Sequence, residues 1–311
     1  MPVKRLLLFL GVIVLAAVAA LAITFLPQTL AVSPAPPITA PAQSVPAGVR
    51  VKAVLAGKVH VRAALAFRGG SFADERIFGT GSILVEHPSG LVLFDAGFGR
   101  NAEAHLRTMP WLMRQTTRME KEGTVAEQLT AAGISRHSLK GVILTHAHWD
   151  HVSGLEDLRG VPVWVNKEEL EFIESGAALT ALARQFGTLD YRVYEFRGGP
   201  YLGFDKSHDF FDDGSVVLVP APGHTPGSIF AFIATTSGER YVLVGDAAWQ
   251  VEGIELPAER PWLSRSLVDS DAEKVRGLLV RLHTLKKAIP DLIIVPAHDR
   301  RIWERLPSLT P

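Results

Sequence analysis

The chain has 311 residues, and its 32 basic and 32 acidic side chains give a formal net charge of +0. This balance offers no long-range attraction for polyanions, so we expect no nucleic-acid partner. The sequence contains no cysteine, which excludes disulfides, thiolate nucleophiles and cysteine-ligated metal centres. Any metal ion must therefore be held by nitrogen and oxygen atoms.

The N-terminus begins with two cations followed by a long apolar stretch. Lys4 and Arg5 precede the uncharged residues Leu6 to Leu26, which are long enough to cross a hydrocarbon core of about 30 Å as a helix. We expect residues 1–26 to be a signal anchor or a signal peptide, with a candidate cleavage site at residues 29–31. The positive-inside rule then exports the rest of the chain, anchored to the outer face of the cytoplasmic membrane or secreted, and periplasmic in a Gram-negative source.

Residues 27–48 contain six prolines among alanines and small polar residues. Such a segment favours neither helix nor sheet and has little apolar bulk, so we expect a proline-rich linker. The folded domain is expected at residues 49–311.

Short runs of β-branched and aromatic residues predict strands along this domain. Residues 51–57 and 59–67 fit strands, and residues 82–86 and 91–95 fit two strands joined by a turn at residues 87–90. Further strands are expected at GVILT (141–145), VPVWV (161–165), YRVYEF (191–196), SVVLVP (215–220), SIFAFI (228–233), RYVLVG (240–245) and LIIVP (292–296).

Helices are expected between these runs. Residues 101–119 and 124–132 are predicted to be helical, with Gly133 ending the second helix. Asn166 is suited to cap a helix over residues 167–175. A mixture of hairpins and crossover helices predicts an α/β protein in which sheets pack face to face with helices outside. A last helix is expected where apolar residues recur at helical spacing, at Val275, Leu278, Leu279, Leu282 and Leu285.

The segment THAHWDHVSG (145–154) places three histidines and an aspartate directly after a predicted strand. In extended chain, His146 and His148 point the same way and can reach one point. Asp150 and His151 are adjacent and diverge, so they can address a second point. The segment is therefore either a metal-binding loop or an unusually polar turn.

Three later residues favour metal binding, because each follows an apolar strand and can reach the same rim of a sheet: His224, Asp246 and His298. Burying such a set of carboxylates and imidazoles without a cation would cost much free energy. The six other histidines match no such pattern, and we expect them at the surface or on strand faces: His60, His87, His105, His137, His208 and His283.

These residues, in this order, together with LVLFDAG at residues 91–97, resemble the metallo-β-lactamase superfamily, in its glyoxalase II and lactonase-like branch. The resemblance covers nearly all of residues 50–300. It implies an αββα sandwich with two metal ions between the sheet edges. By position in the motif, His146, His148 and His224 would hold one ion, Asp150, His151 and His298 the other, and Asp246 would bridge them.

The resemblance implies a hydrolase in which two divalent ions, expected to be zinc with manganese or iron as alternatives, activate a shared water as hydroxide. Asp150 would also orient the nucleophile or return a proton to the leaving group. Asp95, Thr145 and Thr225 are candidates for fixing the ligand side chains from behind.

The implied substrate is a small, acylated or otherwise apolar lactone, ester or thioester. Trp249 stands where lactonases of the family typically carry a tyrosine, and Trp111 and Trp249 are candidates for the substrate pocket. The alternative is a mononuclear-iron oxygenase of the persulfide dioxygenase type on the same scaffold, with His146, His224 and Asp246 as ligand types. The presence of the second ligand set favours the hydrolase.

Overall fold

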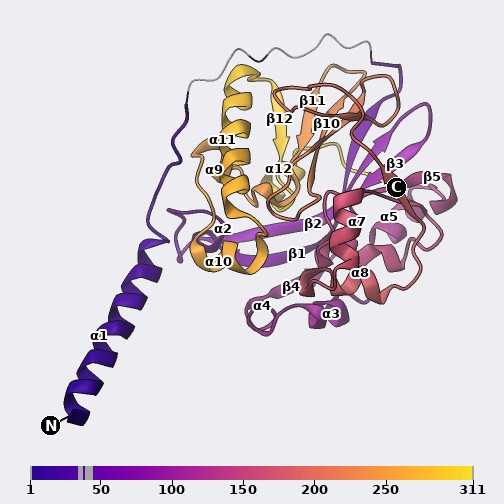
Figure 1. The fold of residues 1–311 in the computed structure, drawn as a ribbon. Helices are drawn as coiled ribbons and strands as arrows, with labels where there is room; N and C mark the ends of the chain where they lie inside the picture. Colours follow the sequence, from indigo (N-terminus) through magenta and orange to yellow (C-terminus); the bar gives the residue numbers. More distant parts are fainter. Residues whose placement is uncertain (1, 34–37, 39–44, 310–311) are drawn as a thin grey trace.

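The computed structural model describes residues 2–33, 38 and 45–309. Helix α1 (Pro2–Ile23) projects away from the body (Figure 1). Within it, Val3–Ile23 is long and apolar enough to cross a membrane, with a mean hydropathy of 3.1 and no burial against the body. Much of the expected linker, residues 34–37 and 39–44, lies outside the described residues.

The first sheet has seven strands in the order β4-β1-β2-β3-β5-β6-β7. The two longest strands, β1 and β2, pair antiparallel with a bulge between Leu55 and Gly57. From β3 to β7 the neighbours run parallel, so their carboxyl ends meet at one edge. The bounds are β1 (Arg50–Arg62), β2 (Glu75–Glu86), β3 (Leu91–Phe94), β4 (Arg118–Lys121), β5 (Leu139–Ile143), β6 (Val163–Asn166) and β7 (Tyr191–Tyr194).

The second sheet has five strands in the order β12-β11-β10-β9-β8. Its pairs are antiparallel except β11 with β12. It packs on the first sheet through one buried cluster, in which Ile83 and Phe94 of the first sheet join Leu218 and Ile229 of the second. The bounds are β8 (His208–Asp209), β9 (Val216–Pro220), β10 (Ile229–Ala234), β11 (Arg240–Leu243) and β12 (Leu292–Val295).

Helices cover the two outer faces. Leu129 of α5 and Ile173 of α7 pack on the first sheet, and Leu282 of α11 packs on the second, which gives the αββα sandwich that the sequence predicts (Figure 1). The bounds are α2 (Ala63–Ala66), α3 (Ala102–His105), α4 (Trp111–Thr116), α5 (Val125–Ala131), α6 (Trp149–Val152), α7 (Lys167–Glu174), α8 (Ala181–Gln185), α9 (Glu252–Glu255), α10 (Trp262–Val268), α11 (Ala272–Ala288) and α12 (Arg300–Trp303), with 3₁₀ turns η1 (Leu106–Thr108), η2 (Arg136–Ser138), η3 (Ser153–Glu156), η4 (Ala178–Thr180) and η5 (Gly245–Ala247).

Two predicted elements are wrong in part. The helix expected over 101–119 breaks before Pro110, because the residue preceding a proline avoids the helical region, and Met109 is extended at ψ 155°. Its last residues, from Arg118, belong to β4. The strand expected over 59–67 stops at Arg62 and gives way to α2. By contrast, the hairpin of β2 and β3 and the Asn166 cap of α7 are confirmed.

The buried carboxylate of Glu169 joins the two halves of the sandwich beside the strand ends. Its Oε1 accepts from the Ala147 backbone N–H at 2.6 Å, in the loop after β5. Its Oε2 accepts from the Thr225 hydroxyl at 2.6 Å and the Gly227 N–H at 3.1 Å, in the loop after β9. Burial outweighs these three donors and raises the pKa of Glu169 from 4.5 to about 7.

This raised pKa makes stability depend on pH. Between pH 4.5 and about 7 an unfolded chain releases the Glu169 proton while the folded chain retains it. The free energy of unfolding should therefore fall by up to about 3 kcal/mol over this window and then level off. Urea unfolding of metal-free, detergent-solubilised wild type and Glu169→Gln across the window measures the effect, since their difference cancels the other titrating groups. A difference independent of pH would contradict it.

Candidate metal centre

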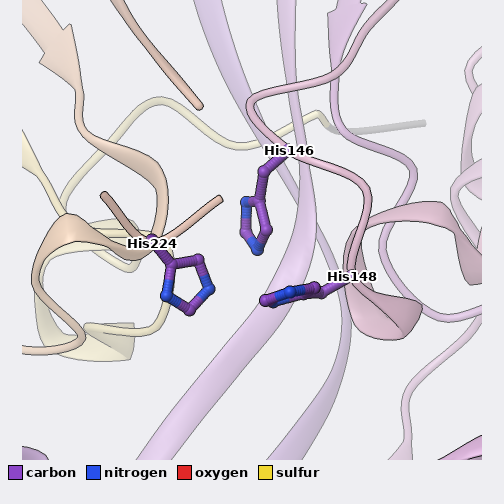
Figure 2. Close-up of side chains that lie close together, drawn as sticks. All are labelled: His146, His148 and His224. Carbon is purple, nitrogen blue, oxygen red and sulfur yellow. The ribbon is translucent and has the colours of Figure 1, made fainter. Parts of the chain in front are cut away.

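The candidate ligands come from loops that follow β5, β9, β11 and β12. His146 and His148 follow β5, His224 follows β9, Asp246 lies in η5 after β11, and His298 follows β12. Figure 2 shows the rings of His146, His148 and His224 turned toward a common point. The strand ends of both sheets thus converge on one buried location. Asp150 and His151 complete the set from α6.

Three groups of side chains place their ligand atoms within 4.8 Å of one another. They are His146 with His148 and His224, His146 with His151 and Asp246, and Asp150 with His151 and His298.

Asp246 lies between these groups. Its Oδ2 is 3.4 Å from Nε2 of His224, while its Oδ1 is 3.3 Å from Nε2 of His151 and 3.1 Å from Nε2 of His298. On the far side, Asp150 Oδ2 is 3.4 Å from Nε2 of His298. One carboxylate therefore faces His224 through one oxygen and His151 and His298 through the other, as a bridging ligand would.

Hydrogen bonds from behind fix three of the rings. Nδ1 of His151 donates to Asp95 at 2.8 Å, and Nδ1 of His224 donates to Asp269 at 2.8 Å. Nδ1 of His298 donates to the Gly79 carbonyl at 2.9 Å. In each ring Nδ1 is engaged on the outside, so Nε2 faces the centre, as metal-binding histidines require.

The atoms that face the centre have no hydrogen-bond partner within the described part of the chain, although all are buried: Nε2 of His146, His148, His151 and His224, and Oδ1 of Asp246. Buried polar atoms are normally paired, because leaving them unpaired costs free energy. Cations between these atoms would remove that cost. The donor set of imidazole nitrogens and carboxylate oxygens fits zinc, manganese or iron.

Electrostatics divide the histidines into two kinds. Burial, reinforced by the neighbouring imidazoles, lowers the pKa of His146 and His148 well below the ordinary value, so both are neutral and ready to bind metal. Burial also acts on His151, but Asp95, Asp246 and Asp150 together raise its pKa well above the ordinary value. The carboxylates of Asp95, Asp246 and Asp150 thus surround His151 with negative charge that attracts a cation.

Unusual backbone geometry positions two of the carboxylates. Asp95, which holds His151, adopts a positive φ of 60°, a strained conformation of the kind that gathers at functional sites. Gly245, directly before Asp246, has φ +47°, and a Cβ there would lie 3.2 Å from the Thr145 side chain. Only glycine fits this position without strain.

Trp249 and Arg260 hold Asp246 from the other side. The Trp249 indole N–H donates to Asp246 Oδ2 at 2.8 Å, and Arg260 donates to the Asp246 carbonyl at 2.7 Å. The Arg260 guanidinium stacks 4.7 Å above the Trp249 ring and also pairs with Asp269. Trp249, Arg260 and Asp269 therefore form one network that contacts both Asp246 and His224.

Of the other predicted residues, Thr145 and Thr225 bond the carboxylates of Asp95 and Glu169, and Trp111 lies at the surface. The Thr145 hydroxyl donates to Asp95 at 2.8 Å, next to the His146 ring. The Thr225 hydroxyl donates to Glu169. Trp111 begins α4 and is 65% exposed.

Sequence reasoning missed Asp269, Arg260 and Glu169. Asp269 lies just before the cap of α11, and Glu169 occupies the third position of α7, where a glutamate is expected for capping alone. Arg260 lies in a loop with no motif. Nothing in the local pattern distinguishes these residues, because their partners are distant in sequence.

Comparison with known proteins identifies the family. Residues 78–298 match the Metallo-beta-lactamase superfamily. A probable metallo-hydrolase of Mycobacterium tuberculosis is 30% identical over 244 residues, which cover 71% of this chain and 75% of that protein. The N-acyl homoserine lactonase AttM of Agrobacterium fabrum is 24% identical over 229 residues, covering 71% of this chain and 81% of the lactonase.

Solved structures share the fold. An N-acyl homoserine lactone hydrolase, solved with N-hexanoyl-L-homoserine at its catalytic metal centre, has a TM-score of 0.65 and 19% identity, covering 84% of this chain and 98% of that one. A mutant of B. thuringiensis AiiA with bound N-decanoyl-L-homoserine gives the same TM-score, identity and coverage. At this identity the likeness shows the fold alone. The chain belongs to the metallo-β-lactamase superfamily and is a metallo-hydrolase of that superfamily.

Proposed function

We propose that the protein is a dinuclear metal-dependent hydrolase that opens a lactone, ester or thioester bond in a small, acyl-bearing substrate. One observation carries the dinuclear assignment: the Asp246 carboxylate lies within 3.4 Å of His224 on one side and of His151 and His298 on the other. A site for a single ion would need this carboxylate to face histidines on one side only. Zinc is the metal that we expect.

Two divalent ions held by these residues would lower the pKa of a water molecule and polarise the carbonyl of the substrate. The chain's own residues prepare the site for this chemistry. Asp95, Asp269 and the Gly79 carbonyl hold ring protons outward, which preserves the ligand geometry during turnover. Asp150, at the edge of the centre, is less buried than the histidines and can return a proton to the leaving group.

Aromatic side chains beside the centre favour an apolar substrate moiety. Phe78 stacks on the ring of His298 at 5.4 Å and contacts Trp249 at 5.6 Å. Phe172 lies 6.5 Å from the ring of His148. Such walls suit an acyl chain next to a polar scissile group. The N-acyl homoserine lactonases among the relatives act on a substrate of this kind, and Trp249 is the residue that we expect to contact it.

We also propose that the enzyme works outside the cytoplasmic membrane. The cations Lys4 and Arg5 lie near the N-terminal end of α1, and the apolar span that follows them is not buried in the protein. The positive-inside rule keeps this end in the cytoplasm.

Hydrolysis should depend on Asp246 and not on histidines elsewhere. We expect zinc-loaded wild type to hydrolyse at least one member of a panel of acyl homoserine lactones, thioesters and aryl esters. Asp246→Ala should lower kcat/KM at least about 10³-fold, because it removes the ligand shared by both ions. The matched control is His137→Ala in η2, an exposed histidine that should have no effect. Equal activity of Asp246→Ala and wild type would refute the proposal.

The Trp249 hydrogen bond should contribute to catalysis. Trp249→Phe keeps an aromatic ring but removes the donor to Asp246, so kcat should fall about tenfold, the equivalent of one hydrogen bond to a charged group. Trp164→Phe is the control, since it removes an indole donor on β6 that bonds the Lys140 carbonyl of β5. Steady-state kinetics on the same substrate compare the two variants. If both lower kcat equally, the effect is general and Trp249 has no special part in turnover.

A further inference from the structure

The end of α1 is bonded to the body of the protein. Arg68, in the loop after α2, donates from Nη2 to the Ile23 carbonyl at 3.0 Å and from Nε to the Leu26 carbonyl at 3.2 Å. The Gly69 N–H donates to the Phe25 carbonyl at 3.0 Å. A cation at these carbonyls satisfies the acceptors that a helix C-terminus leaves free. The chain thus supplies a specific cap for its own N-terminal helix.

The segment after α1 continues along the body. The Leu30 N–H donates to the Pro257 carbonyl at 2.9 Å, and the ring of Phe25 lies 5.1 Å from that of Phe72. The Arg68 N–H donates to the Glu259 carbonyl at 2.9 Å, which joins the loop after α2 to the segment before α10. Cleavage at residues 29–31 would remove the capped helix end from this arrangement, so these contacts favour an anchor that is retained.

Apolar side chains are exposed around this attachment point. Phe72 is 57% exposed, Leu256 is 51% exposed and Trp262 is 50% exposed. We call these three residues the exit surface. They come from the two segments that hold the end of α1, and Figure 1 shows α1 leaving the body beside α2 and α10. Large exposed apolar groups in one place mark an interaction site.

We propose that the exit surface rests in the interfacial layer of a phospholipid bilayer while α1 spans that bilayer. The proposal rests on the anchor proposed above. The occupant follows from continuity, because α1 presents exposed apolar side chains and Phe25, just after its end, contacts Phe72 of the exit surface. Aromatic residues such as Trp262 and Phe72 are favoured at the depth where hydrocarbon meets headgroups.

The metal centre and the exit surface share one stretch of chain. Trp249 and Arg260 contact Asp246, and Leu256 and Trp262 lie in the same short stretch of chain. One segment therefore forms both a wall of the centre and part of the exit surface. The substrate class that fits is an amphiphile whose acyl chain dissolves in the bilayer and whose scissile group lies at the headgroup level.

The absence of cysteine permits a direct test. Single-cysteine variants of the full chain, Phe72→Cys and Trp262→Cys, carry a polarity-sensitive fluorophore and are reconstituted into phosphatidylcholine vesicles with a nitroxide-labelled lipid. Leu15→Cys reports insertion of α1. Val193→Cys is the matched control, because Val193 is 47% exposed on β7, at the sheet edge opposite β4.

We expect the emission at positions 72, 262 and 15 to shift to shorter wavelength and to be quenched by the nitroxide, and position 193 to match the protein in water. The mass of the recovered chain should include residues 1–31. If position 15 is quenched while positions 72 and 262 are not, the proposal that the exit surface lies in the bilayer is wrong, and the proposals of an anchor and a hydrolase remain. If position 15 is not quenched, or the chain is recovered cleaved, the proposals of an anchor and of a membrane-bound exit surface are both wrong. The proposal that the protein is a hydrolase is tested separately and does not depend on this result.

Discussion

The buried carboxylate of Asp246 is the constraint on which the rest of the site depends. It is 6% exposed and faces imidazoles from three separate loops. The neighbouring histidines His298 and His151 lower its pKa well below the ordinary value against the effect of burial. A buried charge with an oxygen left free needs a cation partner, so the fold is arranged around the place where cations would lie.

The same need explains the outer features of the site. The strand ends of both sheets must meet, and Glu169 joins their loops through three hydrogen bonds. The rings must face inward, and Asp95 and Asp269 hold them so. Arg260 then balances the charge of Asp269 and stacks on Trp249. Because this network runs into the segment that carries Trp262, the centre and the proposed membrane surface are parts of one unit.

The sequence predicts most of the sandwich and the candidate ligands at the ends of its strands, because hydrophobic runs and the polar residues that follow them are local signals. The prediction of a helix over 101–119 is wrong where Pro110 interrupts it. Asp269 and Glu169 could not be recognised, since their partners His224 and Ala147 lie far away in the chain. Long-range hydrogen bonds leave no periodic trace in a single sequence.

The central claim is that this chain holds two divalent ions between its strand ends. Mass-spectrometric metal analysis of the full chain, purified in detergent and reloaded from a mixture of zinc, manganese and iron, tests it most directly. We predict two ions per chain, with zinc preferred. One iron per chain, accompanied by oxygen consumption with a persulfide, would contradict the account and favour the alternative of a mononuclear-iron oxygenase.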